Sequence, residues 1–307
     1  DAQAVTFDGD TDMQPDLIWG KRRDSTGHPT IFDSVRGITK GVETNSGGSE
    51  FTSTDYYTAF GSDGFTIAAG ASGAGNGDTQ TAVQWCWKES ATSGFDIVAA
   101  DGTGSARTQA HSLSAVAEWI FVKELDTDGS WYTYTAMTGN TKALFLNATN
   151  AVSGDSSGYW NDTTPTSSVF SLGTDGGVNQ SSTGYIFYLW RSVQGFSKIG
   201  SYTGNGNADG PFLFFGFSPS FIMFKRTDST GAWVMKDNKR DAYNVATKYF
   251  YANANDAEST SYNVDFTANG VKLRGSDAQF NASGGTFIYM AFAEAPFVNS
   301  NGVPCNA

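Results

Sequence analysis

The chain has 307 residues with a net charge of −12, and only 16 % of them are charged, whereas 14 % are aromatic and 36 are Gly. This acidic balance argues against sequence-independent binding to nucleic acid or to an anionic membrane, because both need a basic surface. No run approaches 18 apolar residues, so the sequence predicts no insertion into a bilayer. Aromatic and β-branched segments separated by turn-forming residues predict an all-β protein.

A seven-residue sequence marks an internal repeat. KRRDSTG at 21–27 returns as KRTDSTG at 225–231, and a weaker copy lies within VKELDTDGSW. Lys21, Lys123 and Lys225 are 102 residues apart each time (123 − 21 and 225 − 123). Evenly spaced copies with matching flanks indicate repeated structural units. We therefore predict three tandem units: residues 1–90, 91–193, and 194–307 with a C-terminal tail.

The first unit is predicted to begin incompletely. VTFDGD at 5–10 supplies at most the second half of an opening strand. Strands at 17–23 and 29–34 form a hairpin around the first DSTG, and strands at 62–68 and 82–88 close the unit. A cut chain explains the missing beginning, and so does a strand supplied by a neighbouring subunit to an open edge. We favour the cut chain.

The other two units show the complete pattern of short strands and turn signals. The second has strands expected at 94–104, 118–124, 130–135, 167–173 and 185–191. The third has them at 195–204, 212–217, 221–227, 232–237, 248–254, 263–274 and 286–295. Strands at this spacing predict antiparallel β-sandwiches of a jelly-roll-like kind, each of about 100 residues.

The repeated turn itself has a structural explanation. Asp at its first position and Gly at its last are typical of a type I turn or a bulged hairpin. We expect the Asp side chain to cap the turn and the Gly to take a positive φ. We expect the Lys to lie along an exposed strand or to pair with a carboxylate.

No catalytic, cofactor or metal site is predicted. His28 and His111 stand at non-equivalent places in their repeats, and both are expected in loops. No nucleophile elbow, phosphate loop or dinucleotide fingerprint occurs, and no carboxylate pair can be singled out. Asp8, Asp10 and Asp12 alternate as in a calcium loop, but the Gly and Glu of such a loop are missing.

The two cysteines are too few for a disulfide scaffold or a zinc site. Cys86 lies in the apolar run VQWCWK and is expected to be a buried thiol, whereas Cys305 is expected to be exposed. Nothing in the sequence supports a bridge between them.

The tryptophans divide into two groups. The first group lies in predicted strands and is expected in the core: Trp19, Trp119, Trp131, Trp190 and Trp233. Trp160, between Tyr159 and Asn161 in a predicted loop, is the best candidate for stacking on a sugar ring or a partner protein. Core packing is the alternative for Trp160.

The amino-acid sequences of several segments resemble a known family. LIWGKRRDSTGHPTIFDSVRGITK, GFSKIGSYTGNGNADGPFLFFGFSPSFIMFKRTDSTGAW and NASGGTFIYMAFAEAPF resemble a repeat domain of unknown function in virion structural proteins of tailed phages, especially marine and cyanobacterial ones. The resemblance covers nearly the whole chain. It implies a non-enzymatic fibre, spike or decoration component at the virion surface, in contact with other virion proteins.

The resemblance leaves partners and alternatives open. Fibres and spikes are usually homotrimers, so self-association is expected by analogy, although three copies in one chain would also form a pseudo-trimer. Contact with a host surface glycan is a further expectation. The alternatives are a glycan-degrading tailspike and a subunit of a bacterial surface filament.

Overall fold

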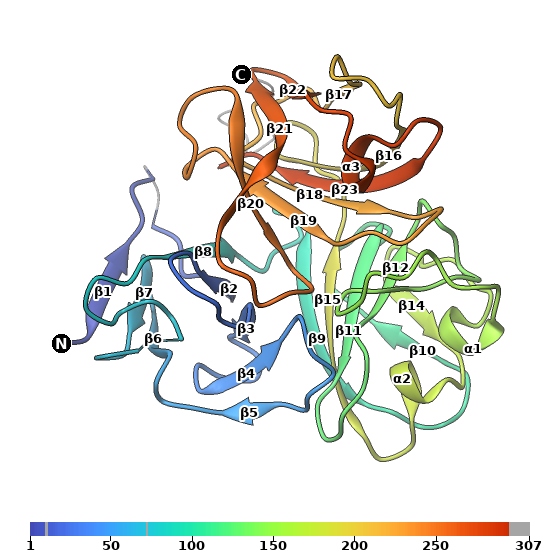
Figure 1. The fold of residues 1–307 in the computed structure, drawn as a ribbon. Coiled ribbons are helices and arrows are strands. Elements are labelled where there is room, and N and C mark those ends of the chain that lie inside the picture. Colours follow the sequence, from blue (N-terminus) through green and yellow to red (C-terminus); the bar gives the residue numbers. More distant parts are fainter. Residues whose placement is uncertain (10–11, 72, 295–307) are drawn as a thin grey trace.

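The computed structural model describes residues 1–9, 12–71 and 73–294, and the chain is all-β with antiparallel strand pairing (Figure 1). The strands are β1 (Gln3–Thr6), β2 (Leu17–Arg22), β3 (Thr30–Asp33), β4 (Lys40–Glu43), β5 (Phe51–Thr52), β6 (Tyr57–Gly61), β7 (Gly64–Ile67), β8 (Ala82–Trp87), β9 (Phe95–Asp101), β10 (Arg107–Ala110), β11 (Trp119–Glu124), β12 (Tyr132–Thr135), β13 (Leu144–Phe145), β14 (Val169–Leu172), β15 (Gly184–Trp190), β16 (Ser197–Thr203), β17 (Phe212–Phe214), β18 (Phe221–Arg226), β19 (Val234–Asp237), β20 (Ala246–Tyr251), β21 (Ser259–Thr267), β22 (Gly270–Leu273) and β23 (Thr286–Phe292). Three single-turn helices are α1 (Ser157–Trp160), α2 (Gly176–Asn179) and α3 (Ala278–Asn281). In the described ranges, no helix has the length and apolar character needed to cross a bilayer.

One strand order recurs in the three large sheets. The strands that carry the repeated lysines are β2, β11 and β18, and each lies between its return strand and a long closing strand. The orders are β5-β4-β3-β2-β8 and β13-β12-β11-β15-β9, and the third sheet contains β16-β23-β18-β19-β20. The third sheet then continues through β21, β22 and β17. The repeat phase read from the sequence is therefore matched by the strand pairing.

Smaller sheets cover the outer faces of the first two large ones. β1 pairs with β7 in one small sheet, and β10 pairs with β14 in another. In the third unit, β17 pairs with β22 in the same way. β1 is thus the counterpart of β10 and β17, so Val5 and Thr6 belong to this outer strand and not to an opening strand beside β8, whereas residue 10 lies outside the described residues. In the second large sheet β9 pairs with the outer side of β15. In the first large sheet no described strand takes the corresponding place beside β8.

The apolar core is shared among the three large sheets. One continuous cluster of buried side chains contains residues from each of them, and aromatic pairs join the sheets directly. Trp19 meets Phe121 with ring centroids 6.2 Å apart, Phe121 meets Trp233 at 6.3 Å, and Trp87 meets Phe221 at 5.6 Å. Figure 1 shows the blue, green and orange sheets grouped around this centre. The units therefore share a core, and the boundaries at 90 and 193 stay a prediction.

The outer faces of the first two large sheets have cores of their own. One outer cluster lies between the second large sheet and β14, and another lies under the β1-β7-β6 sheet. This arrangement explains why β11 is buried along its full length, since its alternating side chains enter two different cores. The five tryptophans predicted to be in the core are all buried, which confirms that prediction.

Shared packing predicts cooperative unfolding. Phe121→Ala removes a ring that contacts both Trp19 and Trp233, and should lower the free energy of unfolding of the whole chain by about 3–5 kcal/mol. Chemical denaturation followed by tryptophan fluorescence and by far-UV circular dichroism should give one coincident transition. Phe170→Ala, in the outer core of the second unit, is the matched control for the loss of a buried Phe. Separate transitions in the Phe121 variant would contradict a shared core.

Candidate functional site

The three repeated lysines are buried, which corrects the expectation that they lie along exposed strands. Lys21 is 1 % exposed, and Lys123 and Lys225 are 0 % exposed. Burial lowers the pKa of Lys21 and Lys123 to about 8 and that of Lys225 to about 7. Each ammonium group donates to backbone carbonyl oxygens, and no carboxylate of the described residues lies within hydrogen-bond distance of it.

The carbonyl partners of the lysines join one unit to the next. Lys21 Nζ donates to the Asn255 oxygen at 3.1 Å, and Lys123 Nζ donates to the Gly47 oxygen at 3.2 Å. Lys225 Nζ donates to the Asn150 oxygen at 2.9 Å. The lysine of the first unit thus donates to the third unit, that of the second donates to the first, and that of the third donates to the second. These lysine contacts close a cycle.

The Gly and Asp of the repeated turn serve the same assembly. Gly27 N donates to the Asn255 oxygen at 2.8 Å, and Gly129 N and Gly231 N make the equivalent bonds to Gly47 and Thr149. None of the three turn glycines is among the residues with positive φ, so that expectation is wrong.

Each Asp side chain accepts from a backbone N–H group on the closing strand or in the turn before it, and Asp24 and Asp228 also accept from Arg22 and Arg226 of their own repeat. Asp24 accepts from Thr81 N at 3.1 Å, Asp126 from Gly184 N at 2.6 Å and Asp228 from Thr286 N at 3.0 Å. The repeated turn is therefore a structural junction.

A second repeated motif, missed at the sequence level, makes polar contacts within the shared core. Asp33 and Arg36 form a buried ion pair at 2.6 Å, and Tyr188 of the second unit donates to Asp33 at 2.7 Å. Asp237 and Arg240 repeat the pair at 2.6 Å, and Trp85 of the first unit donates to Asp237 at 3.2 Å. The signal was available in the sequence, because DSVR and DNKR are separated by twice the repeat length.

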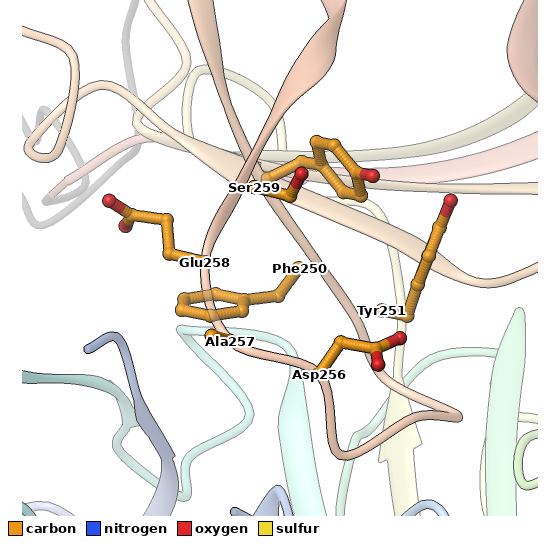
Figure 2. A pocket seen from close by; sticks show the side chains of 7 residues that line it. Phe250, Tyr251, Asp256, Ala257, Glu258 and Ser259 are labelled. Atoms are coloured by element: carbon orange, nitrogen blue, oxygen red, sulfur yellow. The ribbon is translucent and has the colours of Figure 1, made fainter. Parts of the chain in front are cut away.

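A recess in the third unit is a candidate ligand site. It has a volume of about 370 Å³ and lies between β20 and the following segment, lined by Tyr249, Phe250, Tyr251, Asp256, Ala257, Glu258 and Ser259 (Figure 2). The loop before it is longer here: Trp233 N bonds an Asn side chain 20 residues later, whereas Trp131 N bonds one 16 residues later. The third unit thus has extra residues between Trp233 and Asn253, and this longer connection is the feature of the sequence that could have indicated the recess.

Two carboxylates line the recess, but they are unequal. Glu258 is bonded by Arg23 at 2.8 Å and by Arg240 at 3.0 Å, and although burial opposes ionisation, these guanidinium groups hold its pKa below the usual value. Asp256 is exposed, and Figure 2 shows the Glu258 side chain directed away from it. Glu258 is therefore an ion-pair partner, and Asp256 is the carboxylate free to meet a ligand.

Tyrosine rings form one side of the recess. Tyr249 and Tyr251 have ring centroids 5.0 Å apart, and Tyr249 lies 4.5 Å from Tyr262. The Tyr251 and Tyr262 hydroxyl groups are bonded at 2.5 Å. Aromatic rings next to a free carboxylate offer stacking and hydrogen bonding, which is the chemistry that suits a neutral sugar ring.

The residues singled out earlier for ligand contact lie elsewhere. Trp160 is 2 % exposed in the second outer core, where its indole N–H donates to the Lys142 oxygen at 2.7 Å. Its ring is thus not available for stacking, and the alternative of core packing is correct. Tyr159 is half-buried against Tyr132, and Asn161 is exposed with a left-handed φ of 50° at the end of α1. Ligand contact at these two residues stays a prediction.

The remaining groups do not assemble into a second site. His28 is exposed and His111 is half-buried, and the two lie in separate places, with His28 beside Glu43 at 3.2 Å. Within the described ranges, no group of three or more His, Cys, Asp or Glu side chains could hold a metal ion. Cys86 is half-buried in β8, and burial raises the pKa of its thiol. Asp10 and Cys305 lie outside the described residues.

One carboxyl group has a strongly raised pKa. Burial, with a contribution from Asp96, raises the pKa of Glu89 to about 7. Asp96 is itself buried and accepts from Ser112 N at 2.6 Å and from Ser112 Oγ at 2.7 Å. The two carboxyl groups lie on either side of the connection between the first and second units. Protonation of Glu89 therefore changes the charge at this connection.

Comparison with known proteins identifies a family. Residues 3–296 match the family model described as a domain of unknown function (DUF7483). The chain belongs to this family. No curated protein and no solved structure matches the chain. The match covers nearly the whole chain, but the function of the family is unknown.

The buried lysines predict stability that rises in alkali. The pKa of the folded lysines is about 7 to 8, whereas lysines in the unfolded chain have the ordinary pKa of 10.5. Between these values the unfolded state binds more protons, so the free energy of unfolding should increase as the pH rises from about 7 to 10. Urea denaturation across this window measures the slope. Lys123→Met should reduce the slope, whereas Lys198→Met, at an exposed position of β16, should leave it unchanged.

Glu89 predicts a pH dependence of opposite sign at lower pH. Its folded pKa of about 7 exceeds the ordinary Glu pKa of 4.5, so the stabilisation it contributes is complete below about pH 4.5 and is lost as the pH rises through 7. Glu89→Gln should flatten this loss, measured as the midpoint of thermal unfolding between pH 4.5 and 8. The exposed Glu294, at the equivalent position of the third unit, gives the control Glu294→Gln. An unchanged profile in Glu89→Gln would refute the assignment.

Proposed function

We propose that the chain is a non-enzymatic structural protein of a tailed-phage particle, a fibre, spike or decoration component at the virion surface. The observation that carries this proposal is the shared core closed by the lysine cycle. The three buried lysines, together with the Asp–Arg pairs, contact other parts of the same chain. Side chains committed to internal cohesion suit a protein whose task is to be rigid. The resemblance to virion proteins supplies the setting.

The architecture suits such a role in a second way. We infer that each unit derives from one β-sandwich of about 100 residues, and that three such sandwiches have merged along their inner faces. One chain then provides the three-fold form that fibres and spikes usually obtain from three chains. A pseudo-trimer fits a trimeric or three-fold position on a particle, next to other virion proteins.

Contact with a host surface glycan is the second part of the proposal, and the recess of the third unit is its place. Tyr249 and Tyr251 offer ring faces, and Asp256 offers an exposed carboxylate. A neutral sugar is favoured over an anionic one, because the chain carries −12 overall and Asp256 would repel an anion.

The alternatives find less support. A glycan-degrading tailspike needs a cleft in which a general acid lies beside a second carboxylate. Glu89 next to Asp96 has the raised pKa of such an acid, but neither residue lines the recess. In the recess, Glu258 is held ionised by two arginines, which disfavours it as that acid. A filament subunit would fill the place beside β8 with a strand from the next subunit, and that alternative is tested together with the location of the protein.

The deciding experiment locates the chain in its particle. Antibodies raised against the purified chain should label the outside of intact particles of a phage that encodes it, and mass spectrometry should find it in purified virions. The purified chain should release no oligosaccharide from host envelope material. Absence from purified particles would overturn the proposal, and oligosaccharide release that is lost in Asp256→Asn would favour the tailspike.

A further inference from the structure

The outer sheet of the third unit exposes apolar side chains at its edge. Phe214 is 64 % exposed and Phe212 is 45 % exposed, although both belong to the edge strand β17. Leu213 between them is buried, so the two rings share the outer face of the sheet. Two exposed phenylalanines two residues apart place a considerable apolar area in water, which is costly unless something covers it.

The other two units serve as internal controls for this feature. β10 and β1 are the counterparts of β17, and their outward positions carry Thr108 with Ala110 and Ala4 with Thr6. All four of these side chains are exposed and small. The fold therefore does not require large apolar residues at this place, and the phenylalanines of the third unit need an explanation of their own.

The strand itself is open to pairing. β17 bonds β22 on one side, and no described strand pairs with its other side. Edge strands are usually protected by charged side chains, Pro, bulges or short length, and β17, which is three residues long and follows Pro211, has no charged side chain or bulge between Phe212 and Phe214. An open edge next to exposed aromatic rings is a template for another strand.

Charge indicates which strand that is. The chain carries −12, so two copies repel each other over most of their surfaces. Beside β17 the charges balance: Lys272 pairs with Asp209 at 2.7 Å, and Arg274 pairs with Asp265 at 2.6 Å. A region with equal numbers of both signs is complementary to itself, whereas a basic or strongly acidic partner gains nothing from it.

We propose that the β17 edge of the third unit is the interface for a second copy of the chain, in a two-fold dimer. Antiparallel pairing centred on Leu213 places Phe212 of one copy opposite Phe214 of the other, and Phe214 opposite Phe212. Cross-strand aromatic pairs of this kind stabilise sheets. The two third-unit sheets then become one continuous sheet. This inference stands independently of the virion setting, since it concerns the purified chain.

Sedimentation equilibrium of the purified chain tests the proposal. At tens of micromolar we expect a species of twice the 32.7 kDa chain mass, in reversible exchange with the monomer. Phe212→Thr with Phe214→Ala introduces the residues of the second unit and should give a folded monomer, with folding checked by circular dichroism. Val35→Ser with Met137→Ser removes exposed apolar side chains from the other units and should leave the dimer intact. A wild-type chain that is monomeric, or a dimer that survives the double Phe change, overturns the proposal.

Cross-linking tests the geometry separately. In a Cys305→Ser background, chains with Phe212→Cys are mixed with chains carrying Phe214→Cys and are oxidised mildly. The register predicts disulfide-linked heterodimers in clear excess over either homodimer. Equal yields of the three products, or a trimer, would show that the rings meet in another arrangement and would overturn the two-fold pairing.

Discussion

The structure depends on a buried ammonium group at the end of the central strand in each unit. An unpaired charge in an apolar interior is very unfavourable, so each lysine must find oxygen atoms to solvate it. Its own turn supplies only part of that shell for Lys21 and Lys123, and a carbonyl of the adjoining unit supplies the rest. No unit can bury its lysine well without its neighbour. The need to solvate three buried charges thus fixes the relative placement of three sheets.

The polar contacts across the core are not equally distributed. Asp33 with Tyr188 joins the first and second units, and Asp237 with Trp85 joins the third and first. At the corresponding places of the third junction stand Thr135 and Met290. That junction is held instead by packing, by Lys225, by the bond from Gly231 N to the Thr149 oxygen, and by the Trp233 indole N–H, which donates to the Phe145 oxygen at 2.9 Å. Two of the junctions thus include a hydrogen bond to a buried Asp–Arg ion pair, and Thr135 and Met290 cannot form one at the third.

Much of the fold could be predicted from the sequence, because it follows from local pattern. Strand positions, the repeat length and the buried tryptophans all depend on alternation and spacing within a few residues. The surroundings of Lys21 could not be predicted, because its second carbonyl lies 234 residues away and nothing local distinguishes a snorkelling lysine from a buried one. Trp160 failed as a ligand candidate for a related reason: a polar loop sequence does not reveal that its ring turns inward. The recess of the third unit is indicated only indirectly in the sequence, by a longer connection between the Trp and the Asn of a contact that recurs in the second and third units.

The closed cycle has a consequence for how the protein is made. The ribosome releases the first unit long before the segment around Asn255 exists, so the inner face with Trp19 and Trp87 leaves the exit tunnel without its partners. Contacts of such long sequence separation form late and slowly, and an uncovered aromatic face is prone to aggregation while it waits. Maturation is therefore expected to be post-translational, with the emerging first unit as a natural client for chaperones. A protein assembled from three repeats would then acquire its native state in a single late step.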